Sequence, residues 1–217
     1  MEPAEQLNKQ GFVVVDSIIE PSELHFIALN SSAIDHEGVG TRNLLMLDWV
    51  QALAKMLKQH PCIKPLLPGN AKAVQCNYFL KNEQSNWSVT LHRDLSVPVK
   101  AKVESEQWGA WSEKEGVLFA QPPMSVLDSL VVLRLHLEDN TELNGPLEVV
   151  PMSHTPLKEI PSDKHRKKIA IQSGGALIMK PLLLHASMKV VKGQRRVLHF
   201  VFGPSELPDQ AQWKWSV

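Results

Sequence analysis

The stretch ALIMKPLLLHASMKVVKGQRRVLHFVF, residues 176–202, contains two strand-like runs on either side of a histidine and a short polar turn. Ala176–Lys180 and Arg196–Phe202 are rich in aliphatic, β-branched and aromatic residues, which favours buried strands. The turn at 192–194 is expected to bring the second strand back beside the first. Successive side chains alternate between the two faces of a strand, so one residue of the pair Arg195 and Arg196 is expected to face the interior.

Strand-like runs of this kind recur along most of the chain. Four more precede this stretch, at 73–79, 88–94, 131–137 and 147–150, and Gly, Pro and Asn clusters separate them. The basic run at 164–168 lies between two such strands and is expected to be a solvated loop. Many short strands predict a mainly β (α+β) fold, a sandwich or barrel flanked by helices.

The N-terminal part has a different pattern. Residues 2–9 and a segment opening at Pro21 are expected to be helical, with a strand at 12–15 between them. Met46, Val50, Leu53 and Leu57 follow a helical period. The sequence therefore predicts one domain with a mostly helical part over 1–70, a β core over 71–204 and a C-terminal tail over 205–217.

Composition excludes several classes of protein. The 217 residues carry 23 Lys plus Arg and 23 Asp plus Glu, so the formal net charge is zero. Without a surplus of basic residues, binding to nucleic acid or to an acidic membrane surface is disfavoured. No apolar run reaches the ~20 residues of a membrane helix, and the polar N-terminus is no secretory signal. Cys62 and Cys76, each beside apolar residues, are expected to be reduced and buried. These features predict a cytoplasmic protein. A homo-oligomer is compatible with the sequence, which does not specify the oligomeric state.

Nine histidines in the chain direct attention to metal chemistry. His92 and Asp94 are two residues apart in a predicted strand, so their side chains project to one face. His185, at the end of an apolar run, is a candidate third ligand. Two His and one Asp form the facial triad of non-haem iron(II) oxygenases, which leaves coordination positions open. On these residues alone, a strand-end ion pair and a satisfied core histidine remain alternatives.

An oxo-acid co-substrate also needs a cation for its distal carboxylate. Arginine suits this role because its planar fork binds a carboxylate in a bidentate way. Arg195 and Arg196 follow His185 by ten and eleven residues. An arginine that faces the interior without a partner would be costly, so it implies an anion.

Several ordered motifs resemble the phytanoyl-CoA dioxygenase family of Fe(II)- and 2-oxoglutarate-dependent oxygenases. They are GFVV at 11–14, NWSVTLHRD at 86–94, QPP at 121–123 with VVLRLHLED at 131–139, and NGPLEVVPMSH at 144–154. The resemblance extends to His185 and the Arg195–Arg196 pair. Met152 stands where the family usually has Gly, and Gly175 where an Asp is common. The resemblance covers most of the chain.

This resemblance implies a double-stranded β-helix, that is, a jelly roll with helices packed on one side. It implies His92, Asp94 and His185 as the catalytic iron ligands, with 2-oxoglutarate and O2 as co-substrates. Arg195 is favoured over Arg196 as the anchor of 2-oxoglutarate. The expected reaction is hydroxylation of an unactivated carbon of a small molecule, with release of succinate and CO2. Asp94 argues against halogenating relatives, which need a small residue at that position.

Other polar and aromatic residues are candidates for the pocket wall. Gln75 and Asn77 are expected to touch the co-substrate, and the other candidates for pocket lining are Trp87, Trp111, Arg134, His136 and His199; ordinary strand positions or core packing are the alternatives. His154 is expected to fix a loop near the site, and His25, His36, His60 and His165 are expected at the surface. Two other functions remain open: a cupin-like metalloenzyme that does not use 2-oxoglutarate, and a non-catalytic binding relative.

Overall fold

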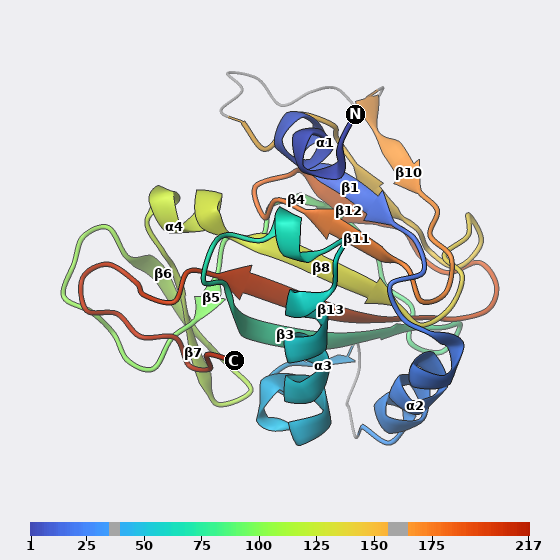
Figure 1. The fold of residues 1–217 in the computed structure, drawn as a ribbon, viewed down its shortest axis with the longest axis horizontal. Helices are drawn as coiled ribbons and strands as arrows, with labels where there is room; N and C mark the ends of the chain where they lie inside the picture. The colour runs from blue at the N-terminus through green and yellow to red at the C-terminus, as the bar shows by residue number, and fades with distance from the viewer. Residues whose placement is uncertain (35–39, 156–164) are drawn as a thin grey trace.

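A computed structural model describes residues 1–34, 40–155 and 165–217. Its largest element is a six-stranded antiparallel sheet (Figure 1). Across the sheet the strands are β1 (Phe12–Val15), β11 (Ala176–Met179), β8 (Val131–His136), β13 (Arg195–Gly203), β3 (Lys72–Lys81) and β2 (Gly40–Thr41). The six strands predicted from 73 onward and the N-terminal strand at 12–15 are all present within the described part of the chain.

A second antiparallel sheet faces the first. It contains β10 (Lys167–Ile169), β9 (Leu147–Val149), β12 (His185–Ser187) and β4 (Val89–His92). A small third sheet joins β5 (Val97–Pro98), β7 (Val117–Gln121) and β6 (Gly109–Lys114) at one side of the molecule (Figure 1). The two larger sheets form the expected jelly roll. The predicted fold class, mainly β with helices on one side, is confirmed.

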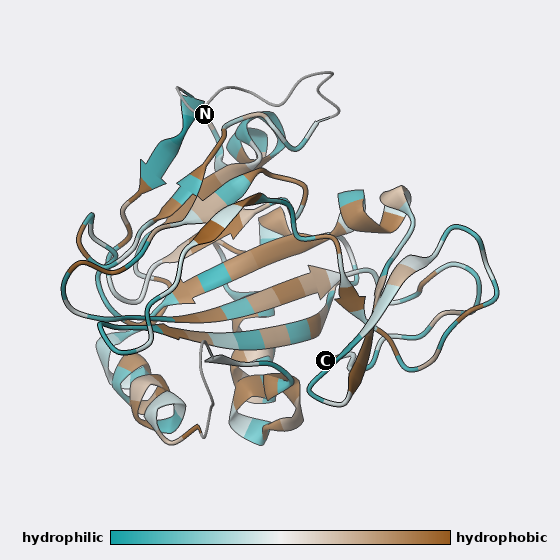
Figure 2. Ribbon diagram, turned by 180° about the vertical axis from the view of Figure 1, so that it is seen from behind, coloured by the Kyte–Doolittle hydropathy of each residue, from teal (hydrophilic) through white to brown (hydrophobic). Residues whose placement is uncertain are grey.

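The helices and the alternation of strand side chains define two apolar layers. The helices are α1 (Pro3–Gln10), α2 (Pro21–Ser32), α3 (Asp48–Gln59) and α4 (Met124–Ser129), with 3-10 turns at Leu44–Met46 and Lys64–Leu66. On β8, Val132 packs into the layer between the sheets, whereas Leu133 packs into the layer that also contains Val50 and Leu57 of α3. Figure 2 shows the resulting mixture of apolar and polar residues along the central strands.

Three expectations about local structure were wrong. Strand β13 does not lie beside β11, because β8 is inserted between them; residues 181–194 cross to the second sheet as β12 before returning. The basic run is not all loop: Lys167 and Lys168 lie on the edge strand β10 with exposed side chains, which suits an unpaired sheet edge, while Lys164 lies outside the described residues. Cys62 is exposed, although Cys76 is buried as expected.

Several short elements escaped sequence reasoning, including the strands β2, β5, β10 and β12. The β6–β7 hairpin and helix α4 are too short to show a clear period.

Of the expected surface histidines, His25 and His165 are exposed and His60 is half-buried, and His36 lies outside the described residues. Within the described ranges, none of the helices has the length and apolarity required to cross a membrane.

Candidate metal and co-substrate site

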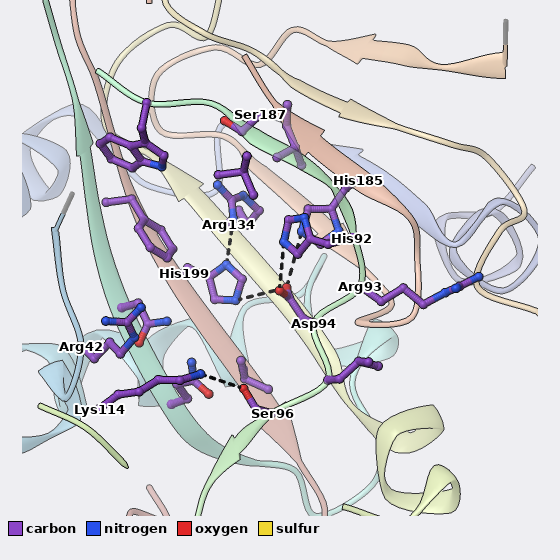
Figure 3. Close-up of a pocket in the computed structure, with 18 of the residues that line it drawn as sticks. Arg42, His92, Arg93, Asp94, Ser96, Lys114, Arg134, His185, Ser187 and His199 are labelled. Carbon is purple, nitrogen blue, oxygen red and sulfur yellow. Dashed lines mark hydrogen bonds and ion pairs between the residues drawn. The ribbon is translucent and has the colours of Figure 1, made fainter. Parts of the chain in front are cut away.

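A cavity of about 430 Å³ opens between the two larger sheets. Its size falls within the ~300–1,000 Å³ typical of small-molecule sites. The wall combines strands β3, β8 and β13 of the first sheet with β4 and β12 of the second, and the third sheet contributes to one side (Figure 3). His92, Asp94 and His185 all line it.

The fold brings these three residues together from two strands. His92 ends β4 and His185 begins β12, and the antiparallel pairing sets them opposite each other. Asp94 follows β4, where its backbone N–H donates to Pro181. Each imidazole Nε2 lies 3.7 Å from a carboxylate oxygen of Asp94. The three ligand atoms lie within 4.8 Å of one another, so the group could hold a metal ion.

Backbone carbonyls fix the tautomers of both histidines. The Nδ1 atoms of His92 and His185 lie 2.9 Å from the carbonyl oxygens of Thr90 and Leu183. A carbonyl only accepts, so in the neutral ring Nδ1 carries the proton and Nε2 presents its lone pair to the carboxylate. Such a second hydrogen bond is typical of a metal-bound histidine.

Asp94 completes the donor set. Its Oδ2 atom is buried and has no hydrogen-bond partner. Burial alone would raise the pKa of this carboxyl, but His185 and His92 outweigh burial and hold the pKa below its ordinary value. Asp94 is therefore ionised. A buried, unpartnered carboxylate oxygen beside two imidazole lone pairs fits a divalent cation such as iron(II).

A third histidine nearby has the opposite tautomer. The guanidinium Nη1 of Arg134 lies 2.9 Å from Nδ1 of His199 (Figure 3). Arginine only donates, so Nδ1 of His199 accepts and Nε2 carries the proton. That Nε2 lies 3.9 Å from Asp94. Burial, followed by the charge of Arg134, lowers the pKa of His199 to about 3, so the ring is neutral. His199 therefore offers a donor, not a lone pair.

Two buried cations occupy another part of the cavity wall. Arg195 is 2% exposed and donates to the Gly145 carbonyl and, at 3.1 Å, to the Ser187 hydroxyl. Lys81 is 1% exposed and donates to the same hydroxyl at 2.7 Å and to the Met188 carbonyl. Burial and then the charges of Arg195 and Arg134 lower the pKa of Lys81 to about 7. Within the described ranges, neither cation has a carboxylate partner.

Arg196, in contrast, points away from the cavity. It forms an ion pair with Glu138 and also donates to Ser32 at the end of α2. Adjacent residues on β13 face opposite sides of the sheet, and Arg195 is the one that faces the cavity. Arg196 therefore has its own carboxylate on the helical side, and it does not line the cavity.

The other predicted pocket residues divide into two groups. Gln75, Asn77, Trp87, Arg134 and His199 line the cavity, and the side-chain oxygens of Gln75 and Asn77 are buried without a partner. Trp111, on β6 of the small third sheet, stacks on Trp108 and does not line the cavity. His136 is buried outside the cavity wall, with neither ring nitrogen partnered.

A hydrogen-bonded clamp supports the segment before His185. Arg93, between the two candidate ligands, donates to the carbonyls of Leu182 and Ser153. The hydroxyl of Ser153 in turn accepts from the backbone of Leu184. His154 contacts the α1 residue Asn8 instead. Ser153 thus supports the segment before His185, while His154 makes a structural bond that ties its own turn to α1.

Sequence reasoning missed Lys81 and Ser187 at the site. Ser187 could have been found, because it lies two residues after His185 and therefore on the same face of β12. Lys81 could have been found in the same way, because it lies two residues after Phe79, on the face of β3 that also carries Gln75 and Asn77. Its contact with Ser187, 106 positions away, could not be foreseen.

The family model for phytanoyl-CoA dioxygenase (PhyH) matches residues 7–197, most of the chain. The chain belongs to the phytanoyl-CoA dioxygenase family. Membership in this family supports the assignment of the protein as a 2-oxoglutarate-dependent oxygenase. Its cofactors are iron and 2-oxoglutarate, and O2 is the usual co-substrate. No curated protein matches this family member in a sequence search.

Solved structures of similar fold support the jelly-roll assignment. The non-haem α-ketoglutarate-dependent epimerase SnoN from nogalamycin biosynthesis aligns with a TM-score of 0.68 at 13% identity, over 94% of this chain and 82% of SnoN. HygX from Streptomyces hygroscopicus, with nickel and 2-oxoglutarate bound, aligns with a TM-score of 0.66 at 16% identity, over 94% of this chain and 88% of HygX. The non-haem monooxygenase ThoJ, as a nickel complex, aligns with a TM-score of 0.69 at 14% identity, over 99% of this chain and 82% of ThoJ.

Proposed function

We propose that this family member is a hydroxylase of a small molecule, with iron(II) held by His92, Asp94 and His185. The overall reaction consumes the substrate, 2-oxoglutarate and O2, and releases the hydroxylated product, succinate and CO2. The observation that carries the proposal is one cavity that combines the candidate triad with the buried cations Arg195 and Lys81. Bound iron(II) would supply the activation of dioxygen and of the oxo acid at this place.

The residues of this chain would bind and orient the co-substrate. The guanidinium of Arg195 would pair with the distal carboxylate of 2-oxoglutarate, helped by the Ser187 hydroxyl and the ammonium of Lys81. The Nε atom of Arg195 is buried without a partner, as expected of a group that awaits an anion. Such charge-assisted bonds are about twice as strong as neutral ones.

Gln75, Asn77, Arg134 and His199 would surround the reacting end of the co-substrate. They line the cavity, and His199 directs its Nε2–H toward Asp94. We propose that this proton orients the carboxylate. The aliphatic and aromatic wall around them, which includes Phe79 and Leu147, would limit access of water.

Two measurements test this function. The zinc(II)-loaded protein is titrated with 2-oxoglutarate by calorimetry, and the iron(II)-loaded protein is assayed for succinate in air. We expect saturable, metal-dependent binding and slow succinate release that a true substrate accelerates. A protein that binds zinc but not 2-oxoglutarate would favour a metalloenzyme of another class. A protein that binds no divalent metal would favour a non-catalytic binding role.

A further inference from the structure

A second group of polar side chains lies at the rim of the cavity, on the other side of the triad from Ser187. Lys114 at the end of β6, Arg42 after β2 and Ser96 after Asp94 all line the cavity (Figure 3). All three are half-buried, whereas Lys81 and Arg195 are buried. The rim group is therefore open to solvent and to an incoming molecule.

Lys114 is held in place without a counter-charge. Its Nζ lies 3.3 Å from the Ser96 hydroxyl and 4.9 Å from the ring centroid of Phe119. Arg42, in contrast, is paired with Glu115 at 2.8 Å. No ion pair of Lys114 exists among the described residues. Burial and then the charge of Arg42 lower the pKa of Lys114, and the more weakly acting charge of Asp94 opposes them.

The proposed cofactors leave this charge unmatched. Asp94 and the C1 carboxylate of 2-oxoglutarate would balance a bound dication, and the distal carboxylate would balance Arg195. Glu115 already balances Arg42. Lys81 would share the distal carboxylate with Arg195, and Arg93 donates to backbone carbonyls. Of the other cations in the cavity lining, Lys114 and Arg134 have no carboxylate. An anion that approaches Lys114 would form a charge-assisted pair with it in a partly buried wall.

Lys114 also lies within reach of the chemistry. Its hydroxyl partner Ser96 is two residues from Asp94, so the two Cα atoms are no more than about 7 Å apart. An anion at the rim would place the rest of a small molecule beside the triad.

We infer that Lys114, with Ser96 and the Arg42–Glu115 pair beside it, binds a carboxylate or phosphate group of the primary substrate. This inference rests on the proposed function, and it makes the substrate a small organic acid or phosphate ester. Lysine suits either group because it acts as a point charge with three donors.

The test uses the full chain saturated with zinc(II) and 2-oxoglutarate. Acetate and methyl phosphate are titrated separately at constant ionic strength, and the backbone amide shifts of Ser96 and Lys114 are followed by NMR. Lys114→Met removes the charge, and Lys102→Met removes an exposed lysine outside the cavity. Lys114→Gln serves as the second variant if Lys114→Met does not fold.

We expect saturable shifts with at least one anion, about tenfold weaker binding in Lys114→Met and unchanged binding in Lys102→Met. The anion that binds more tightly identifies the chemical group. Absence of shifts with both anions, or equal binding by the Lys114 variant, overturns the inference. Failure of the proposed function is seen separately, because 2-oxoglutarate would then leave the amides of Ser187 and Arg195 unshifted before any anion is added.

Discussion

His92 and His185 face each other across paired strands β4 and β12, with their ring centroids 4.2 Å apart. Each ring donates its Nδ1 proton to a carbonyl two residues earlier in its own chain segment. Two imidazole lone pairs are thereby set side by side before any metal binds. This arrangement is preorganised, because neither ring must change tautomer to become a ligand.

Removal of either ring is expected to abolish tight metal binding. His185→Ala should weaken zinc(II) affinity by more than the ~10–100-fold that loss of an outer hydrogen-bond partner costs. His25→Ala changes an exposed histidine of α2 and should leave affinity unchanged. Competition with a chromophoric chelator measures both variants. Equal affinity in His185→Ala and the wild type would remove this residue from the metal site.

The two adjacent arginines of β13 are expected to behave differently. Arg195→Met should lower the affinity for 2-oxoglutarate on the order of 100-fold, since truncation of a buried charged partner costs ~2–5 kcal/mol. Arg196→Met removes the Glu138 pair, which is partly exposed, and should cost at most ~1 kcal/mol of stability.

Calorimetric titration with 2-oxoglutarate compares the two variants directly. Arg196→Met is the matched control, because it removes the same group from the other face of the same strand. A greater loss of affinity in Arg196→Met than in Arg195→Met would contradict the assignment.

Lys81 is expected to make 2-oxoglutarate binding depend on pH. Its pKa is about 7 in the free protein, and a bound carboxylate would raise it. Above pH 7 binding must therefore take up a proton, so affinity should fall with rising pH, by at most about tenfold per unit. Below pH 7 Lys81 is already charged and its contribution is flat. Lys81→Met should remove the slope, and a slope that survives in this variant would assign it to another group.

The same pKa predicts the opposite trend for the stability of the ligand-free protein. The folded pKa of Lys81 lies below the ordinary value of 10.5, so the folded state is penalised fully at pH values below about 7. The penalty disappears as the pH rises from 7 toward 10.5, and the free energy of unfolding should increase over that window. Urea unfolding at several pH values, in the wild type and in Lys81→Met, measures this contribution.

Met152 is expected to be a source of backbone strain. Its φ angle is +68°, in the left-handed region, and its side chain is 52% exposed. Met152→Gly should stabilise the protein by about 0.5–1 kcal/mol, because relief of the strained conformation exceeds the entropy cost of glycine. Met152→Ala keeps the strain and should bring no gain. The urea unfolding midpoints of the two variants measure this difference in stability. A higher midpoint in Met152→Ala than in the wild type would show that backbone strain is not the cause.

The sequence by itself was sufficient for the features that depend on local alternation. Strand positions follow from apolar runs, and the shared face of His92 and Asp94 follows from a spacing of two. The statement that one of Arg195 and Arg196 faces inward has the same origin. The apolar run before His185 made this residue a candidate ligand, and the family motifs supported its link to Asp94, 91 residues away.

Only the tertiary structure decided which residues meet across the cavity. The contact of Lys81 with Ser187, the pairing of Arg42 with Glu115 and the tautomer set by Arg134 on His199 join residues 65 to 106 positions apart. The order of strands was also misjudged, because β13 pairs with β8 and β3, not with β11. A periodic pattern fixes the face to which a side chain points, whereas strand pairing and burial fix its neighbours. The net charge of the chain is zero, so composition does not indicate a cationic cavity wall. The wall forms because the fold brings together cations that are far apart in the sequence.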